Sequence, residues 1–258
     1  MIPVDDPSDE RIAAFVGLRD RDLQRQDGLF VAESDLLIAR ALRAGYEMRA
    51  ALVDATRPEP LIVPDGVPVY AASRAVLERI TGLGVHRGSI GSFVRRPVPA
   101  AAQVMARRQR IIVLEGVVNP TNMGVIVRSA VALGWEAVLL DPTCTDPLFR
   151  RSARVAMGTV YGFPHATLPR FPAGLQQVAD AGFTLVALTP DADAEAIDEV
   201  AVDGPIALVF GSEGPGLTTE ALATCHRLVR IPLADGVDSL NVASAAAIAC
   251  WALRPNTR

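Results

Sequence analysis

The sequence predicts an α/β protein whose larger part is a parallel sheet covered by helices, with a smaller α/β unit before it. Two observations predict this class. Five apolar runs of strand length follow one another in the second half of the chain, and segments with helical patterns separate them. Strands buried on both faces are apolar almost without interruption, and parallel strands need a helical crossover between them. A sheet with helices on both faces is therefore expected.

Residues 1–96 are expected to form the small α/β unit. Its expected helices and strands, in chain order, are a polar helical start from Asp9, a strand at 28–32, a helix at 34–44 ended by Gly45, strands at 48–53 and 68–71, and a helix near 74–80. Residues 97–108 combine prolines and small residues with flanking arginines, which is typical of a linker.

The second domain is expected over residues 109–258. Its five apolar runs lie at 111–118, 137–141, 183–189, 205–211 and 228–233. Ligands of parallel sheets bind beyond the carboxyl ends of the strands. The loops that follow these runs are therefore the places to look for function.

Composition and charge exclude several classes of function. The chain has 258 residues, 50% of them hydrophobic, and a net charge of −4, which indicates a globular protein that does not coat nucleic acid over its whole surface. Its 3 cysteines and 3 histidines have no metal-ligand spacing, so no metal is expected. The longest weakly polar stretch, 242–253, is shorter than the roughly 20 residues of a membrane span. With no signal-peptide pattern at the start, we expect a cytoplasmic protein without a membrane partner.

One segment is strongly basic although the whole chain is acidic. Between residues 74 and 110 the only acid is Glu78, and the arginines are Arg74, Arg79, Arg87, Arg95, Arg96, Arg107, Arg108 and Arg110. Such a cluster is the electrostatic pattern of a protein that binds a phosphate backbone. A solvated linker rich in arginine is the alternative, and the segment alone does not decide between them.

The first unusual loop, NPTNMG, follows the run at 111–118. Asn119 and Asn122 can cap the next helix, and Arg128 lies one turn into it beside apolar residues. An arginine on an apolar helix face is expected to be paired or to face a ligand. The alternative is a guanidinium that extends into solvent.

Two further loops follow strands. In FGSEGPGL, Glu213 lies among backbone amides at a strand-to-helix turn, where a carboxylate can orient an arginine or accept from a ligand. A structural turn with an incidental acid is the alternative. In the segment 231–253, Ser239 and Asn241 are capable helix caps before an alanine-rich helix, which by itself is ordinary capping.

Together, N-x-x-N-x-G-x-x-x-R, G-S-E-G-x-G and I-P followed by S-L-N, in this order, resemble the SpoU (TrmH-like) branch of the SPOUT superfamily of RNA methyltransferases. The resemblance covers roughly residues 111–253. It implies an α/β domain with a trefoil knot, a homodimer, and S-adenosyl-L-methionine bound in the knot loops at the subunit interface. Residues 28–54 resemble the small substrate-binding domain that precedes many such catalytic domains, although Ser34 stands where glycine is usual.

Matched position by position, the resemblance implies that the active-site residues are Arg128, Asn122, Glu213, Ser239 and Asn241. It implies that Gly211, Ile231 and Leu240 hold the cofactor. The chain departs from the family pattern at Asn119, often Asp, and at Ala156, where serine is common.

The implied reaction transfers a methyl group to a ribose 2′-hydroxyl of RNA. Arg128 is expected to grip the substrate phosphate and hydroxyl, with Ser239 and Glu213 fixing its geometry. The basic segment then becomes the expected RNA track, formed by Arg87, Arg95, Arg96, Arg107 and Arg108, and with Phe93 its only aromatic residue, backbone contacts should dominate.

The resemblance favours ribosomal RNA, most of all large-subunit rRNA, because the members with an extra N-terminal domain usually act on it. A tRNA ribose methyltransferase and a catalytically idle RNA-binding or assembly protein of the same fold remain alternatives. A nicotinamide-dependent dehydrogenase would need G-x-G-x-x-G where the chain has NPTNMG.

Overall fold

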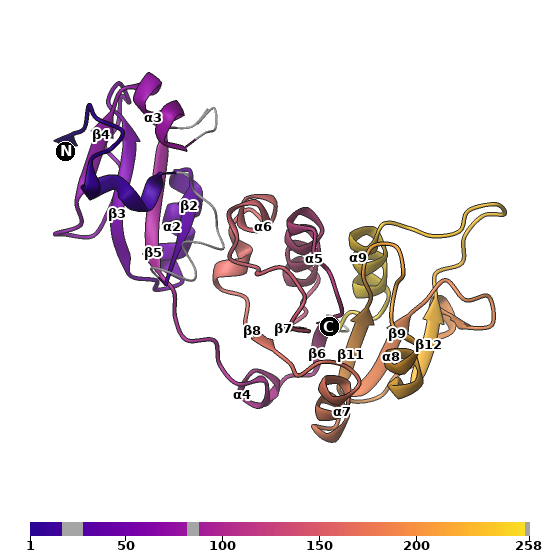
Figure 1. Cartoon of the computed structure of the whole chain (residues 1–258). Helices are drawn as coiled ribbons and strands as arrows, with labels where there is room; N and C mark the ends of the chain where they lie inside the picture. The colour runs from indigo at the N-terminus through magenta and orange to yellow at the C-terminus, as the bar shows by residue number, and fades with distance from the viewer. Residues whose placement is uncertain (17–27, 82–87, 256–258) are drawn as a thin grey trace. The chain divides into compact units, whose positions relative to one another are not determined.

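The computed structural model describes residues 1–16, 28–81 and 88–255, which form two units (Figure 1). Unit 1 comprises Met1–Pro97 together with Leu148–Gly162, and unit 2 comprises Val98–Pro147 and Phe163–Arg258. Within the described ranges, no helix combines the length and the apolar character that crossing a membrane requires.

Unit 1 is built on a five-stranded mixed sheet. The strands, in sheet order, are β1 (Ile2–Pro3), β4 (Val69–Ala72), β3 (Met48–Asp54), β5 (Ser89–Val94) and β2 (Leu29–Glu33). The first three are parallel, and β5 runs antiparallel to both of its neighbours. The helices are η1 (Glu10–Phe15), α2 (Asp35–Arg43) and α3 (Arg74–Thr81). Every strand and helix expected in this part is present, whereas β1 and β5 were not predicted.

Residues 148–162 group with unit 1, although the sequence placed them in the second domain. They contain α6 (Arg150–Val155) and η2 (Thr159–Tyr161). The ring of Tyr161 lies 5.4 Å from that of Phe30 on β2, between ring centroids. Arg150 donates from Nε to Oε1 of Glu33 over 2.6 Å. Aromatic packing and a largely buried ion pair therefore bind this segment to β2, and neither contact is visible in the local sequence.

Ser34, directly before α2, has a φ of +85° and makes no side-chain capping bond. A positive φ is unfavourable for any residue with a Cβ and free for glycine. The resemblance leads us to expect glycine at this position, and the chain adopts the positive φ with a serine.

Unit 2 is built on a seven-stranded sheet in which every pairing is parallel. The strands, in sheet order, are β10 (Glu195–Ala196), β12 (Arg227–Arg230), β9 (Thr184–Leu188), β11 (Ile206–Phe210), β6 (Arg110–Leu114), β7 (Ala137–Leu140) and β8 (His165–Thr167). The parallel α/β class is confirmed, and each of the five expected runs contains a strand. The two strands that were not predicted, β8 and β10, have only 3 and 2 residues.

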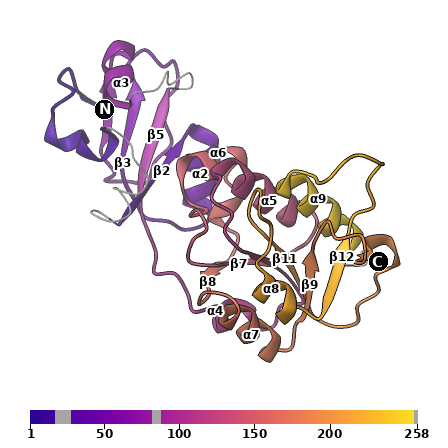
Figure 2. The same cartoon turned by 45° about the vertical axis from the view of Figure 1, so that its right-hand side comes forward.

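Helices cover both faces of this sheet. The helices α4 (Ala101–Met105), α7 (Ala173–Asp180) and α8 (Thr219–Thr224) pack in one core cluster with side chains of β6 such as Ile111 and Val113. Figures 1 and 2 show α5 (Pro120–Ala132) and α9 (Val242–Ala252) side by side on the other face. The segment 97–108, expected as a linker, thus contains a helix whose side chains are part of the unit 2 core.

The strand register brings the expected loops to one edge. Phe210 pairs with Leu114 and Leu114 with Leu140, so β11, β6 and β7 end at the same level. The next strand along, β9, ends at Leu188 beside β11. The loops after these strands therefore emerge together, as the parallel topology requires. The trefoil knot that the resemblance implies stays a prediction.

Candidate functional site

The NPTNMG loop leads straight into α5, and its two asparagines do different things. Asn119 is the helix cap, since its Oδ1 accepts from the Thr121 amide over 2.8 Å. Pro120 occupies the first helical position, where a missing N–H costs nothing. Asn122, the other expected cap, is 7% exposed and uses its amide on other loops instead.

Asn122 is the middle of a hydrogen-bonded chain of three side chains. Its Nδ2 donates to Oε1 of Glu213 over 2.7 Å. Its Oδ1 accepts from Nδ2 of Asn241 over 3.2 Å. Asn241 also caps α9, because its Oδ1 accepts from the Ala243 amide over 2.9 Å. Three of the five expected catalytic residues are thus brought together, and we call them the Asn–Glu–Asn cluster.

Glu213 owes its position to a tight loop at the end of β11. Ser212 and Gly216 bond to each other through their backbones, at 3.1 and 3.2 Å. A Cβ on Gly211 would lie 2.1 Å from the carbonyl carbon of Gly216 and 2.2 Å from the amide of Leu217. Only glycine allows this close approach of two backbone segments. The role of Gly211 visible here is to close the loop that holds Glu213.

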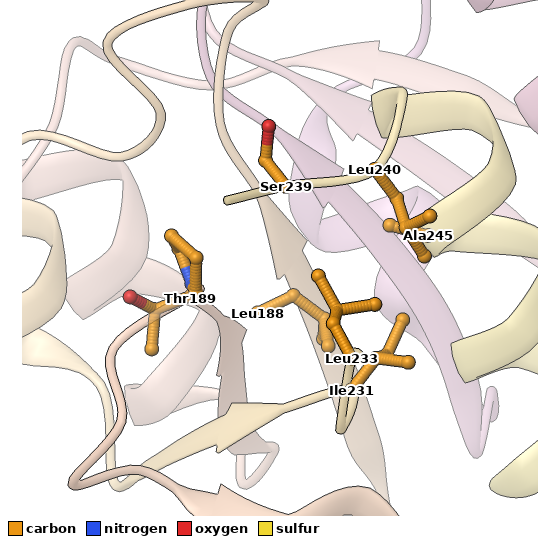
Figure 3. Close-up of a pocket in the computed structure, with 8 residues that line it drawn as sticks. Leu188, Thr189, Ile231, Leu233, Ser239, Leu240 and Ala245 are labelled. Atoms are coloured by element: carbon orange, nitrogen blue, oxygen red, sulfur yellow. The ribbon is translucent and has the colours of Figure 1, made fainter. Parts of the chain in front are cut away.

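A pocket of about 90 Å³ lies where the loops after β9 and β12 meet the start of α9 (Figure 3). It contains Ile231, Leu240 and Ser239 from the expected set, and its full lining is Leu188, Thr189, Pro190, Ile231, Leu233, Ser239, Leu240 and Ala245. Gly211 does not line it. Thr189 and Pro190 were missed by the sequence analysis. Thr189 is the last residue of the predicted run at 183–189 and Pro190 follows it, and this position at the end of a predicted strand was the available signal.

The lining of this pocket fits an adenosyl cofactor in its chemistry. Apolar side chains of Leu188, Ile231 and Leu240 offer a surface for a flat base, and Thr189 and Ser239 are the hydroxyl-bearing residues of the lining. Ligand pockets combine such apolar walls with a few polar groups that fix orientation. The expected cofactor residues Ile231 and Leu240 and the expected catalytic Ser239 therefore share one pocket.

Arg128 is not part of the Asn–Glu–Asn cluster. Its side chain is exposed, and within the described residues its guanidinium makes no hydrogen bond and no ion pair. The buried face of α5 consists of Asn122, Met123, Gly124, Ile126, Val127 and Ala130. The sequence placed Arg128 among these apolar residues, whereas the helix turns it outward. Its expected bonds to Ser239 and Glu213 are absent from this single chain.

The arginines expected to bind RNA are mostly occupied by backbone carbonyls. Arg95 donates to Leu29 O, Arg96 to Gly45 O, and Arg108 to Val104 O and Glu136 O. Within the described part of the chain, Arg107 is the one member of this set whose guanidinium has no partner. Arg87 lies outside the described residues. Phe93 is fully buried and stacks on Phe30, so it offers no ring to a base.

The cysteines are free, and burial makes them inert. It raises the pKa of Cys144 and of Cys225 to about 12, and raises that of Cys250 as well. Their thiols therefore stay protonated near neutral pH. Across residues 1–16, 28–81 and 88–255, no group of three or more metal-ligating side chains could hold an ion.

Comparison with known proteins shows similarity to one protein family. The model of the SpoU rRNA Methylase family matches residues 109–251. A protein of Mycobacterium tuberculosis (strain ATCC 25618 / H37Rv), named as an uncharacterized tRNA/rRNA methyltransferase, is 39% identical over 257 residues, which cover 95% of this chain and 89% of the relative.

Two solved structures have the same fold. An AdoMet-bound rRNA methyltransferase from Sinorhizobium meliloti aligns with a TM-score of 0.84 at 24% identity, over 97% of this chain and 96% of its own. A structure named as an RNA 2′-O ribose methyltransferase aligns with a TM-score of 0.82 at 28% identity, over 97% of both chains.

Proposed function

Since the chain belongs to the SpoU methylase family, we propose that it transfers the methyl group of S-adenosyl-L-methionine to a ribose 2′-hydroxyl of RNA. The observation that carries this proposal is the Asn–Glu–Asn cluster beside the pocket that contains Ile231, Ser239 and Leu240. Residues of the family motifs form the cluster and line the pocket. They lie on three loops at one edge of the parallel sheet.

The pocket residues are proposed to hold the cofactor. Ile231 and Leu240 would contact its base, and the Thr189 and Ser239 hydroxyls would bond its polar edge. Gly211 acts indirectly, by closing the loop that carries Glu213. When bound, S-adenosylmethionine supplies a methyl group on a sulfonium centre. After the methyl group is transferred, the sulfur leaves as part of a neutral thioether.

The remaining task of the protein is to align the 2′-hydroxyl and to help remove its proton. Arg128 is proposed to bind the phosphate next to the target ribose and to donate to the hydroxyl oxygen. Its fork of donors suits a phosphate, and its guanidinium has no competing partner within the described residues. The guanidinium offers donors and no acceptor, so we assign the proton of the 2′-hydroxyl to the substrate phosphate.

Ribosomal RNA is the proposed substrate, with tRNA as the alternative. The M. tuberculosis relative carries both substrates in its name, whereas the S. meliloti protein, which aligns over both units of this chain, is named as an rRNA methyltransferase. An additional N-terminal unit gives a second surface for a large folded RNA. An idle RNA-binding protein is disfavoured because all five motif residues are present.

We also propose a homodimer formed through α5 and α9. Ile248 and Trp251 lie on one side of α9 and are exposed, Trp251 by 58%, and Val131 on α5 is exposed as well. Exposed apolar side chains on two adjacent helices favour a covered surface. Arg128 lies one turn before Val131 on the same helix side, so a partner subunit at this surface would also face Arg128.

The experiment is transfer of labelled methyl from S-adenosylmethionine to separated rRNA and tRNA, followed by alkaline hydrolysis. A 2′-O-methyl group blocks cleavage at its nucleotide, so the label should appear in an alkali-resistant dinucleotide from rRNA. Label in tRNA alone would select the alternative substrate. Label released as a mononucleotide would refute ribose methylation, and no label in either RNA despite cofactor binding would favour the idle protein.

A further inference from the structure

A second pocket, of about 340 Å³, opens at the same edge of the unit 2 sheet. It lies over the ends of β6, β7, β8 and β11, which are neighbours in the sheet (Figure 1). Ser212, Pro215 and Gly216 line it, so the loop that holds Glu213 in the Asn–Glu–Asn cluster also forms one wall of this pocket. A ligand here would lie directly beside the proposed methyl-transfer site.

One wall of the pocket carries a free cation and an aromatic ring. Arg170, in the loop between β8 and α7, is exposed, and its guanidinium has no partner among the described residues. Phe171 follows it and is half-buried, packed partly against the core. A guanidinium next to an aromatic ring suits a nucleotide, because the guanidinium can bind the phosphate and the ring can stack on the base.

The lining also contains a carboxylate, Asp141, whose two oxygens are used unequally. Asp141, 7% exposed, receives three hydrogen bonds, from the amides of Gly116 and Thr143 and from the Thr143 hydroxyl, and all three end on Oδ1. Among the described residues, no backbone amide or hydroxyl donates to Oδ2, and the Cys144 thiol, which lies beside the carboxylate, also donates to Leu114 O over 3.4 Å. The second carboxylate, Glu115, is fully engaged, since both its oxygens accept from Thr218.

We infer that this pocket binds a neighbouring nucleotide of the substrate RNA whose base carries an exocyclic amino group, with its phosphate on Arg170 and its amino group donating to Asp141. Carboxylates select amino-bearing bases, since cytosine N4 donates where uracil O4 accepts. RNA is read in this way where its bases are unstacked. This inference rests on the proposed function, because it takes the occupant to be part of the RNA that is methylated.

The test uses mononucleotides with the full chain, while saturating S-adenosylhomocysteine occupies the cofactor pocket. NMR titration should give CMP an affinity about tenfold above that of UMP, corresponding to one good polar contact. CMP should also bind more tightly than cytidine. Arg170→Gln should abolish the difference between CMP and cytidine and leave the base preference. Arg151→Gln changes an exposed arginine outside the pocket whose guanidinium also has no partner among the described residues, so it is the matched control and should change neither.

Asp141→Asn is the decisive variant. Its Oδ1 can keep the three loop bonds, and its Nδ2 then replaces the acceptor by a donor. The preference should reverse, with UMP binding more tightly than CMP. Retained binding of S-adenosylhomocysteine shows that the variant is folded, and if it is not folded, Arg170→Gln decides alone.

Equal binding of CMP and UMP by the wild-type protein, or no effect of Arg170→Gln, would overturn the inference. With RNA as substrate, Arg170→Gln should raise KM about tenfold and leave kcat and cofactor affinity unchanged. If the wild-type protein methylates RNA but binds CMP and UMP equally, the proposed nucleotide pocket is refuted and the proposed function stands. A clear base preference without methyl transfer to any RNA refutes the proposed function and leaves the pocket standing.

Discussion

Asn122 of α5 donates to Glu213 over 2.7 Å, which joins side chains that are 91 residues apart in the chain. The contact exists because β6 and β11 are adjacent and parallel, so the loops that follow them meet. Asn122 is buried and satisfied at both ends of its amide, which makes it a rigid support for the carboxylate. The fold thus positions Glu213 before any substrate arrives.

Glu213→Ala tests this support. It leaves the Asn122 amide donor buried without its acceptor, which costs about 1–3 kcal/mol of unfolding free energy. We expect a lower melting temperature and at least about a tenfold loss of methyl transfer. Glu220→Ala, an exposed acid of α8, is the control and should melt as the wild type does. The double variant Asn122→Ala, Glu213→Ala should be less destabilised than the sum of the single variants, and strict additivity would show that the two side chains are not coupled.

Gly211→Ala tests the tight loop. The new Cβ would clash with the backbone of Gly216 and Leu217, so the loop must open and move Glu213. We expect loss of methyl transfer together with a lower melting temperature. Gly162→Ala is the control, because nothing lies within 4 Å of its Cβ position and its φ is −101°. A Gly211→Ala enzyme with normal turnover would mean that the loop geometry is unimportant.

Trp251→Glu tests the proposed dimer. A carboxylate on the exposed side of α9 cannot be covered by an apolar partner surface without a large desolvation cost. Sedimentation velocity should give a dimer for the wild-type protein and a monomer for the variant. Glu47→Gln, an exposed charge change on unit 1, should leave the dimer intact. A wild-type protein that sediments as a monomer at micromolar concentration would refute the dimer.

Arg107→Gln tests the revised RNA track. Arg95, Arg96 and Arg108 each donate to a backbone carbonyl, whereas the guanidinium of Arg107 has no partner in the described ranges, so all its donors can bind a phosphate. Losing one phosphate contact should reduce the slope of log K against log salt by about 0.7–1 and weaken binding equally for all RNA sequences. Arg108→Gln should instead lower the melting temperature. A salt slope unchanged in Arg107→Gln would exclude this residue from the track.

The periodic parts of the fold could be predicted from sequence, and the non-local parts could not. The strands β6, β7, β9 and β11 are recognisable because each is a nearly continuous apolar run, whereas β12 (Arg227–Arg230) carries two arginines and fits this pattern less closely. Short edge strands such as β10 (Glu195–Ala196) leave no such pattern. The grouping of Tyr161 with Phe30, and the outward turn of Arg128, depend on tertiary packing that no local window contains.

The candidate site could also be predicted only in part from the sequence. Asn122, Glu213 and Asn241 were identified through the motifs, and their mutual hydrogen bonds follow from the parallel order of the strands. Thr189 was missed because its loop has no motif, although it is the last residue of the predicted run at 183–189. The basic segment stays a prediction as an RNA track, and the sequence alone could not show that Arg95 and Arg108 donate to backbone carbonyls.

The most direct test of the central claim compares Arg128→Ala with the wild-type protein for S-adenosylmethionine binding and for methyl transfer to the same RNA. Arg128 is exposed and unpaired in the described structure, so the variant should fold normally and bind the cofactor as the wild type does. Methyl transfer should fall by about 100-fold or more. Arg128→Lys should recover little, because a lysine lacks the fork of donors. Near-normal turnover of Arg128→Ala would contradict the proposed site.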